Sequence, residues 1–135
     1  MRIVLDTNCL IQSVSPHSAY YEVWKSLVSG DNTLCVSNEI IEEYIEILQK
    51  LFNHRFAETI VKTIVNSPFA EFVTPYYRFQ LIEADPDDNK FVDCAIASNA
   101  KYIVSNDHHY DVLRKTVFPR VEVVVLDEFL ELIKR

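Results

Sequence analysis

Short apolar runs alternate along the chain with longer segments whose apolar residues recur at helical spacing. The run Ile3, Val4 and Leu5 contains no alternating polar residue, which is typical of a strand buried on both faces of a parallel sheet. This alternation of strands and helices predicts an α/β fold with a parallel sheet of about five strands. The predicted strands are 3–5, 33–37, 71–74, 102–104 and 121–126, and the predicted helices are 10–14, 19–28, 38–51, 53–67, 85–100, 111–115 and 128–134.

Small polar residues and a single glycine mark the expected ends of these elements. Ser18 and Asp127 are predicted to cap the helices that follow them, and Asp85 with the proline after it predicts another helix start. Gly30 is predicted to end its helix in a left-handed conformation. The segment 75–82 fits either a loop or an edge strand.

Two of the predicted strands are followed by acidic residues. Asp6 comes after the first strand, and Asp107 comes after the strand 102–104. Ligands of open α/β sheets gather at the carboxyl ends of the strands, so both acids stand where chemistry is expected. The alternative is structural, because Asp6 or Thr7 can also cap the next helix.

Helical acids supply further candidates. Glu43 lies at the border of the apolar stripe of helix 38–51 and can lean toward Asp6, although a solvated glutamate fits the pattern too. Asp88 shares a face with apolar residues, where a carboxylate is costly unless it is paired or bound to a metal. Asp93 lies about 140° around the same helix, so the two aspartates cannot be equally close to one ion.

The composition narrows these options. The length of 135 residues fits one domain over residues 1–135, and the lack of a long apolar run predicts a cytoplasmic protein without a membrane span. The net charge of -7 argues against a nucleic-acid partner, but two divalent ions would offset about four charges. Gly30 is the only glycine, which excludes a Gly-rich phosphate loop. The cysteines are predicted to be small core residues in a reducing compartment: Cys9, Cys35 and Cys94.

The candidate acids are expected along one edge of the sheet if its crossovers are right-handed. Four neighbouring carboxylates repel one another and therefore need counter-charge. Lys90 is the only basic residue beside them in these motifs, so hard divalent cations such as Mg²⁺ or Mn²⁺ are the natural answer. The acids in question are Asp6, Glu43, Asp88 and Asp107.

Four blocks, in order and covering essentially the whole chain, resemble PIN-domain proteins. They are most similar to the toxin components of prokaryotic toxin-antitoxin systems, relatives of the VapC-type toxins. The resemblance implies a three-layer α/β/α fold and a metal-dependent endoribonuclease specific for single-stranded RNA. The blocks are Val4-Leu5-Asp6-Thr7-Asn8, Ser37 to Leu48 with Glu43, Asp85 to Ala95, and Tyr102 to Asp107.

The same resemblance implies roles for individual residues. Asn8 and Ser105 would hydrogen-bond to the acids that hold the metal. Asp93 stands where many relatives have a small residue, which leaves its role open. One or two Mg²⁺ or Mn²⁺ ions would be bound by the catalytic acids Asp6, Glu43, Asp88 and Asp107.

The expected partners are RNA, a cognate antitoxin and a second copy of the chain in a homodimer. Lys90, Arg114 and Lys115 are candidates for contacts to the RNA backbone, although ordinary solvated charges fit them too. The alternative function is a PIN-like module that binds RNA or a partner with little or no cleavage.

Other classes of site fit less well. His108 and His109 are adjacent and point in different directions, which disfavours a histidine-based zinc site, while contact of one of them with a substrate phosphate stays open. A haloacid-dehalogenase-like phosphatase needs an aspartate where Asn8 stands, and a receiver domain needs an acidic pair before Asp6.

Overall fold

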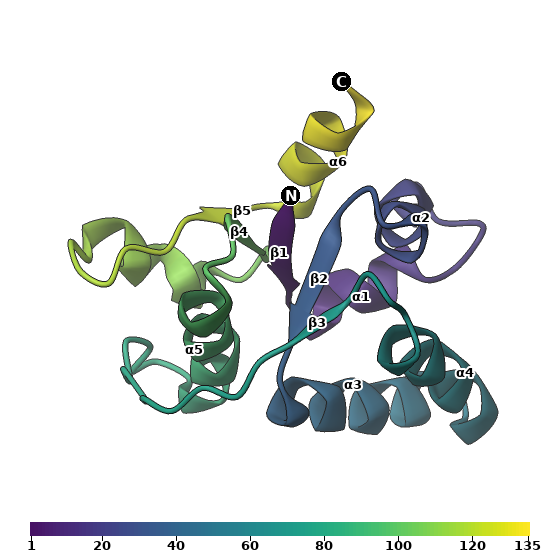
Figure 1. The fold of residues 1–135 in the computed structure, drawn as a ribbon, viewed down its shortest axis with the longest axis horizontal. Coiled ribbons are helices and arrows are strands. Elements are labelled where there is room, and N and C mark those ends of the chain that lie inside the picture. The colour runs from purple at the N-terminus through teal and green to yellow at the C-terminus, as the bar shows by residue number, and fades with distance from the viewer.

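The computed structural model describes residues 1–135 and has a central sheet of five parallel strands in the order β3-β2-β1-β4-β5 (Figure 1). The apolar run predicted from the sequence forms the central strand, and its Ile3, Val4 and Leu5 are fully buried. The predicted α/β fold is therefore confirmed. The strands are β1 (Arg2–Leu5), β2 (Thr33–Val36), β3 (Glu71–Phe72), β4 (Tyr102–Val104) and β5 (Val123–Val124).

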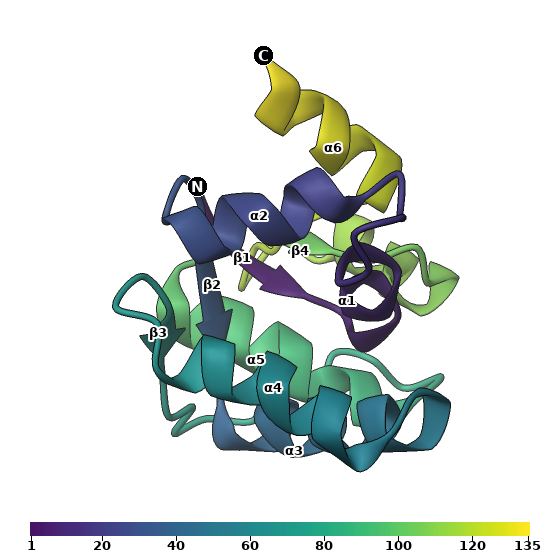
Figure 2. The same cartoon turned by 90° about the vertical axis from the view of Figure 1, so that its right-hand side faces the viewer.

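Helices cover both faces of this sheet and complete a three-layer α/β/α arrangement. Figure 2 shows α2 and α6 on one side of β1, with α3, α4 and α5 on the other side. None of the helices combines the length and the hydrophobicity that a membrane-spanning helix requires. The helices are α1 (Thr7–Ser13), α2 (Tyr21–Ser29), α3 (Asn38–Leu51), α4 (His54–Val65), α5 (Asn89–Ser98) and α6 (Leu126–Lys134), with 3-10 helices η1 (Pro86–Asp88) and η2 (His108–Lys115).

Several predicted helix ends are confirmed. The Asn38–Leu51 helix has the predicted bounds, and the Ser37 side chain caps it by accepting a hydrogen bond from the N–H of Ile40. Gly30 ends α2 with a φ of 88°. A Cβ atom at Gly30 would stand 2.6 Å from the ring of Phe69. Both this close contact and the positive φ disfavour larger residues at this turn.

Two predicted caps are wrong. The α2 helix begins at Tyr21, and Ser18 accepts a hydrogen bond from Tyr20 outside the helix. Asp127 lies inside the first turn of α6, where its carboxylate accepts a hydrogen bond from the Tyr20 hydroxyl at 2.7 Å. The aspartate joins α6 to the start of α2 instead of capping its own helix.

The segments between β3 and β5 are less regular than the sequence predicts. Strands β3 and β5 are shorter than expected, and residues 75–82 contain no helix or strand. The predicted helix 85–100 divides into η1 and α5, because its first turn closes by a hydrogen bond between residues three apart, from Asp88 N–H to the Asp85 carbonyl. The predicted helix 111–115 is part of the longer 3-10 helix η2.

The core lies between the sheet and its helices. Cys9, Cys35 and Cys94 are fully buried and free, as predicted for small core residues. The register pairs Leu5 with Val104 across β1 and β4. The residues that follow these two strands therefore emerge side by side at the carboxyl edge of the sheet.

Candidate active site

Asp6 and Asp107 meet at the ends of β1 and β4 through a serine. The Ser105 hydroxyl donates a hydrogen bond of 2.7 Å to the Oδ2 atom of Asp6. The same hydroxyl oxygen accepts a bond of 3.1 Å from the backbone N–H of Asp107. Ser105 is buried and comes directly after Val104, the last residue of β4. Because Val104 pairs with Leu5 of β1, the sheet register places Asp6 and Asp107 together.

The side chain of Asp6 does not cap α1. Asp6 occupies the position before the helix, but its carboxylate makes no capping hydrogen bond, and Thr7 already lies within the helix. The alternative interpretation of these residues as simple caps is therefore wrong. Burial raises the pKa of Asp6, and the nearby charges of Glu43 and Asp107 raise it further against the opposing bond from Ser105. Asp6 is an acid held in a place that disfavours its charge.

Glu43 reaches the same edge from α3. Its carboxylate accepts a hydrogen bond from the Thr7 hydroxyl, one residue after Asp6. Its other oxygen lies 2.8 Å from the Nζ atom of Lys90 at the start of α5. Lys90 is mostly buried in this ion pair, so it compensates Glu43 and does not extend into solvent.

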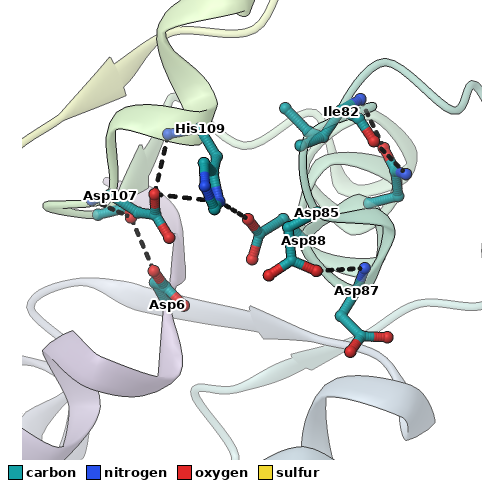
Figure 3. Close-up of polar contacts among 9 residues, drawn as sticks. Asp6, Ile82, Asp85, Asp87, Asp88, Asp107 and His109 are labelled. Carbon is teal, nitrogen blue, oxygen red and sulfur yellow. Dashed lines mark hydrogen bonds and ion pairs between the residues drawn. The ribbon is translucent and has the colours of Figure 1, made fainter.

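Asp88 faces Asp107 across a histidine. The Nδ1 atom of His109 lies 3.2 Å from Oδ2 of Asp88 and 3.3 Å from Oδ1 of Asp107, and Figure 3 shows the ring between the two carboxylates. Burial raises the pKa of Asp88 to about 6 despite this contact. The hydrogen bond to Asp88 raises the pKa of His109, which favours the charged imidazolium between two acids.

The Asp88–His109 contact belongs to a set of potential metal ligands. One ligand atom from each of Asp85, Asp88 and His109 lies within 4.8 Å of the others. Asp85 also caps η1, as predicted, by accepting a hydrogen bond of 3.1 Å from the N–H of Asp87. Because Asp85 is held as a cap, its carboxylate stays beside Asp88.

The structure does not bring every candidate to this cluster. Asn8 is exposed, and its side chain makes no hydrogen bond. Asp93 accepts a hydrogen bond of 3.1 Å from the N–H of Phe79 and so contacts the 75–82 segment. Arg114 and Lys115 are exposed at the end of η2.

Sequence reasoning did not identify His109 as a bridge between two acids, nor the tyrosine after it as a buried polar group. The bridge depends on η2, whose 3-10 turn begins directly after Asp107. The N–H of His109 donates a bond of 2.8 Å to the Asp107 side chain, and this cap turns the imidazole back toward the site. Such a cap was the available signal, since an aspartate before a short helix commonly accepts from the residue two positions on.

Comparisons with known proteins agree with this arrangement. A solved structure of VapBC2 from Rickettsia felis, bound to a DNA fragment from its promoter, has a chain that resembles this one with a TM-score of 0.63. The two chains are 18% identical, and the match covers 93% of this chain and 98% of that one. No curated protein matches the sequence. The model of the PIN domain family matches residues 2–109, and the chain therefore belongs to the PIN domain family.

Proposed function

We propose that this protein is a metal-dependent endoribonuclease that cleaves single-stranded RNA as the toxin of a toxin-antitoxin pair. The observation that carries the proposal is the environment of Asp6, which is buried beside Glu43 and Asp107 and has no basic side chain in contact with it. A buried carboxylate among other carboxylates needs a cation. The nuclease activity known for the PIN domain family supplies the reaction class.

The donor atoms fit Mg²⁺ or Mn²⁺. The four acids follow two strands or lie on α3 and η1, with their charges near enough to affect one another, and hard divalent cations prefer oxygen ligands. When bound there, such an ion lowers the pKa of a coordinated water so that it can attack a phosphodiester. The residues proposed to hold one or two ions are Asp6, Glu43, Asp88 and Asp107.

The chain's own groups have distinct tasks in this proposal. Ser105 fixes the carboxylate of Asp6 and the backbone of Asp107, so two of the acids are positioned before any ion arrives. Lys90 and His109 hold the outer acids in place, and both must loosen their contacts when an ion competes for those carboxylates. The exposed Arg114 and Lys115 remain candidates for contacts to the RNA backbone.

The partners follow from the family and from the structural neighbour. VapBC2 is a toxin-antitoxin complex by its description, and we propose a comparable small antitoxin for this chain. A homodimer is also proposed, and the exposed Tyr76 and Tyr77 are aromatic surface that such a contact can cover. The cytoplasm is the proposed compartment, since all three cysteines are free.

Cleavage of a panel of single-stranded RNAs in Mg²⁺, Mn²⁺ or EDTA tests the proposal. The parent protein should cleave only with a divalent cation, and Asp6→Asn should lose about 100-fold in rate, the upper end of the range of about 10- to 100-fold that changes to groups around metal ligands cost. Asp31→Asn is the matched control, because this exposed acid precedes β2 at the opposite edge of the sheet.

The outcomes separate the two functions under consideration. Metal-dependent cleavage that is lost in Asp6→Asn and retained in Asp31→Asn supports the nuclease. RNA binding without cleavage by the folded parent protein supports the binding module instead. Equal cleavage by the parent and Asp6→Asn contradicts the proposed site.

A further inference from the structure

One polar atom in the core has no partner. The hydroxyl of Tyr110 is the only buried side-chain nitrogen or oxygen atom of the protein that makes no hydrogen bond, and the residue is 1% exposed. Buried polar groups are nearly always hydrogen-bonded, because leaving one unpaired is costly. This hydroxyl therefore calls for an explanation beyond packing.

The unpaired hydroxyl lies in the field of the acidic cluster. Tyr110 stands in η2, three residues after Asp107, and its N–H contacts the Asp107 carbonyl at 3.4 Å. Burial raises the pKa of Tyr110, and the charges of Asp6, Asp88, Asp107 and Glu43 raise it further. The hydroxyl thus keeps its proton as a hydrogen-bond donor, and it is near enough to all four acids to be affected by their charges.

A second buried tyrosine shows what a satisfied hydroxyl looks like in this core. Tyr44 is fully buried in α3, and its hydroxyl donates a hydrogen bond of 2.5 Å to the Leu5 carbonyl. Burial likewise raises the pKa of Tyr44. The same core thus pairs one tyrosine with its own backbone and leaves the hydroxyl of Tyr110 available to a ligand.

We propose that the Tyr110 hydroxyl donates a hydrogen bond to the hydration shell of the divalent cation held by the four acids, and so acts as a positioning residue. The inference rests on the proposed function, because it requires the acids to bind a cation. Mg²⁺ gives up its water reluctantly and keeps several molecules when bound to carboxylates. Donors around that shell fix its orientation and contribute to affinity.

The test compares wild type with Tyr110→Phe by calorimetric titration with Mn²⁺ and by thermal unfolding in EDTA. The substitution keeps the ring and removes only the hydroxyl, so we expect Mn²⁺ affinity to fall about 10-fold. The Tm in EDTA should stay the same or rise, because an unpaired polar group leaves the core. If the hydroxyl had only a structural role, its removal would leave the Mn²⁺ affinity unchanged and would lower the Tm in EDTA.

Tyr44→Phe is the matched control. It removes a hydroxyl that is paired, so its Tm in EDTA should fall while its Mn²⁺ affinity changes less than that of Tyr110→Phe. Equal affinity of Tyr110→Phe and wild type overturns the inference and leaves the proposed function standing. A lower Tm of Tyr110→Phe in EDTA also overturns it, and absence of Mn²⁺ binding by wild type overturns both proposals.

Discussion

The two halves of the acidic site compensate charge differently. At the strand ends, Asp6 receives a hydrogen bond from the neutral Ser105, and no basic side chain contacts it. On the helices, each acid has a basic partner: Glu43 has Lys90, and Asp88 has His109. Positive charge thus lies at the helical rim of the cluster, where His109 also contacts Asp107, and is missing at Asp6.

This difference separates rigid positioning from exchangeable pairing. Asp6 and the backbone of Asp107 are fixed by the sheet register and by hydrogen bonds to Ser105, which involve no basic side chain, although the Asp107 carboxylate also contacts His109. The helical acids are fixed by ion pairs, which a divalent cation can replace. We therefore expect changes on the helical half to alter the stability of the cation-free protein, and to be partly reversed by the cation.

The largest such effect is predicted for Lys90→Met. The change keeps the aliphatic stem and leaves Glu43 without its cation in a site where the two side chains are only 16% and 22% exposed. Breaking a mostly buried pair from one side should lower the free energy of unfolding by about 3 kcal/mol in EDTA, measured by urea titration. Saturating Mn²⁺ should restore most of this loss, because it supplies the missing positive charge.

Lys62→Met provides the matched control for that measurement. Lys62 pairs with Glu58 at 2.7 Å on α4, but the two side chains are 67% and 47% exposed. An exposed pair of this kind contributes at most about 1 kcal/mol. The contrast between the buried Lys90–Glu43 pair and the exposed Lys62–Glu58 pair would be contradicted if both variants lost the same free energy of unfolding. It would also be contradicted if Mn²⁺ did not restore the stability of Lys90→Met.

A smaller effect is predicted for the pH dependence due to Asp88. Its pKa is raised from 3.8 to about 6 by burial, so the folded protein keeps a proton that the unfolded chain has already lost. The stability of the cation-free protein should therefore fall as pH rises from about 4 to above 6, by about 2 kcal/mol from this group. Urea titrations across this range measure the slope.

The Asp88→Asn variant removes this contribution together with the increase that Asp88 causes in the pKa of His109, which acts in the same direction. Asp6 contributes in the same direction, since its pKa is also raised by burial, and it is retained in both proteins. The difference in unfolding free energy between wild type and Asp88→Asn should decline across the window and then level off. A difference that rises with pH would mean that His109 stabilises the charged carboxylate more than burial opposes it.

The sequence predicted the strand-end half better than the helical half, for a physical reason. A buried parallel strand is a short apolar run, so its carboxyl end and the acid after it can be located from the pattern alone. The bounds of α3 were also predictable, because Ser37 and the apolar stripe of that helix agree. Together these features place Asp6, Asp107 and Glu43 on the correct elements.

The pairings on the helical half could not be read in the same way. Lys90 and Glu43 are 47 positions apart and meet only because α3 and α5 pack on the same face of the sheet. His109 turns toward Asp88 because η2 is a 3-10 helix and not an α-helix, and no hydrophobic period marks that choice. Local patterns predict elements, whereas these contacts depend on how the elements pack.

The smallest predicted effect concerns Asp93, which lies on α5 but contacts neither half of the site. It is 4% exposed and accepts a hydrogen bond from the Phe79 N–H, so its task is to hold the irregular 75–82 segment against the helix. Asp93→Ala should lower the free energy of unfolding by about 1 kcal/mol, because a backbone N–H loses its acceptor. Asp93→Asn keeps an acceptor oxygen and should lose less.

Cleavage assays on the same two variants sharpen the distinction between Asp93 and Asp88. Both aspartates are buried acids within one stretch of six residues, yet only Asp88 contacts the cluster, through His109. We expect both Asp93 variants to retain the parent's cleavage rate within about threefold, since the change lies outside the site, and Asp93→Ala to be cut faster by protease within residues 75–82. Loss of cleavage in Asp93→Asn, with its fold intact, would place Asp93 in the metal site and contradict the separate roles of the two aspartates. Retained cleavage with a loosened segment would instead show that a buried acid in this protein can serve the backbone alone.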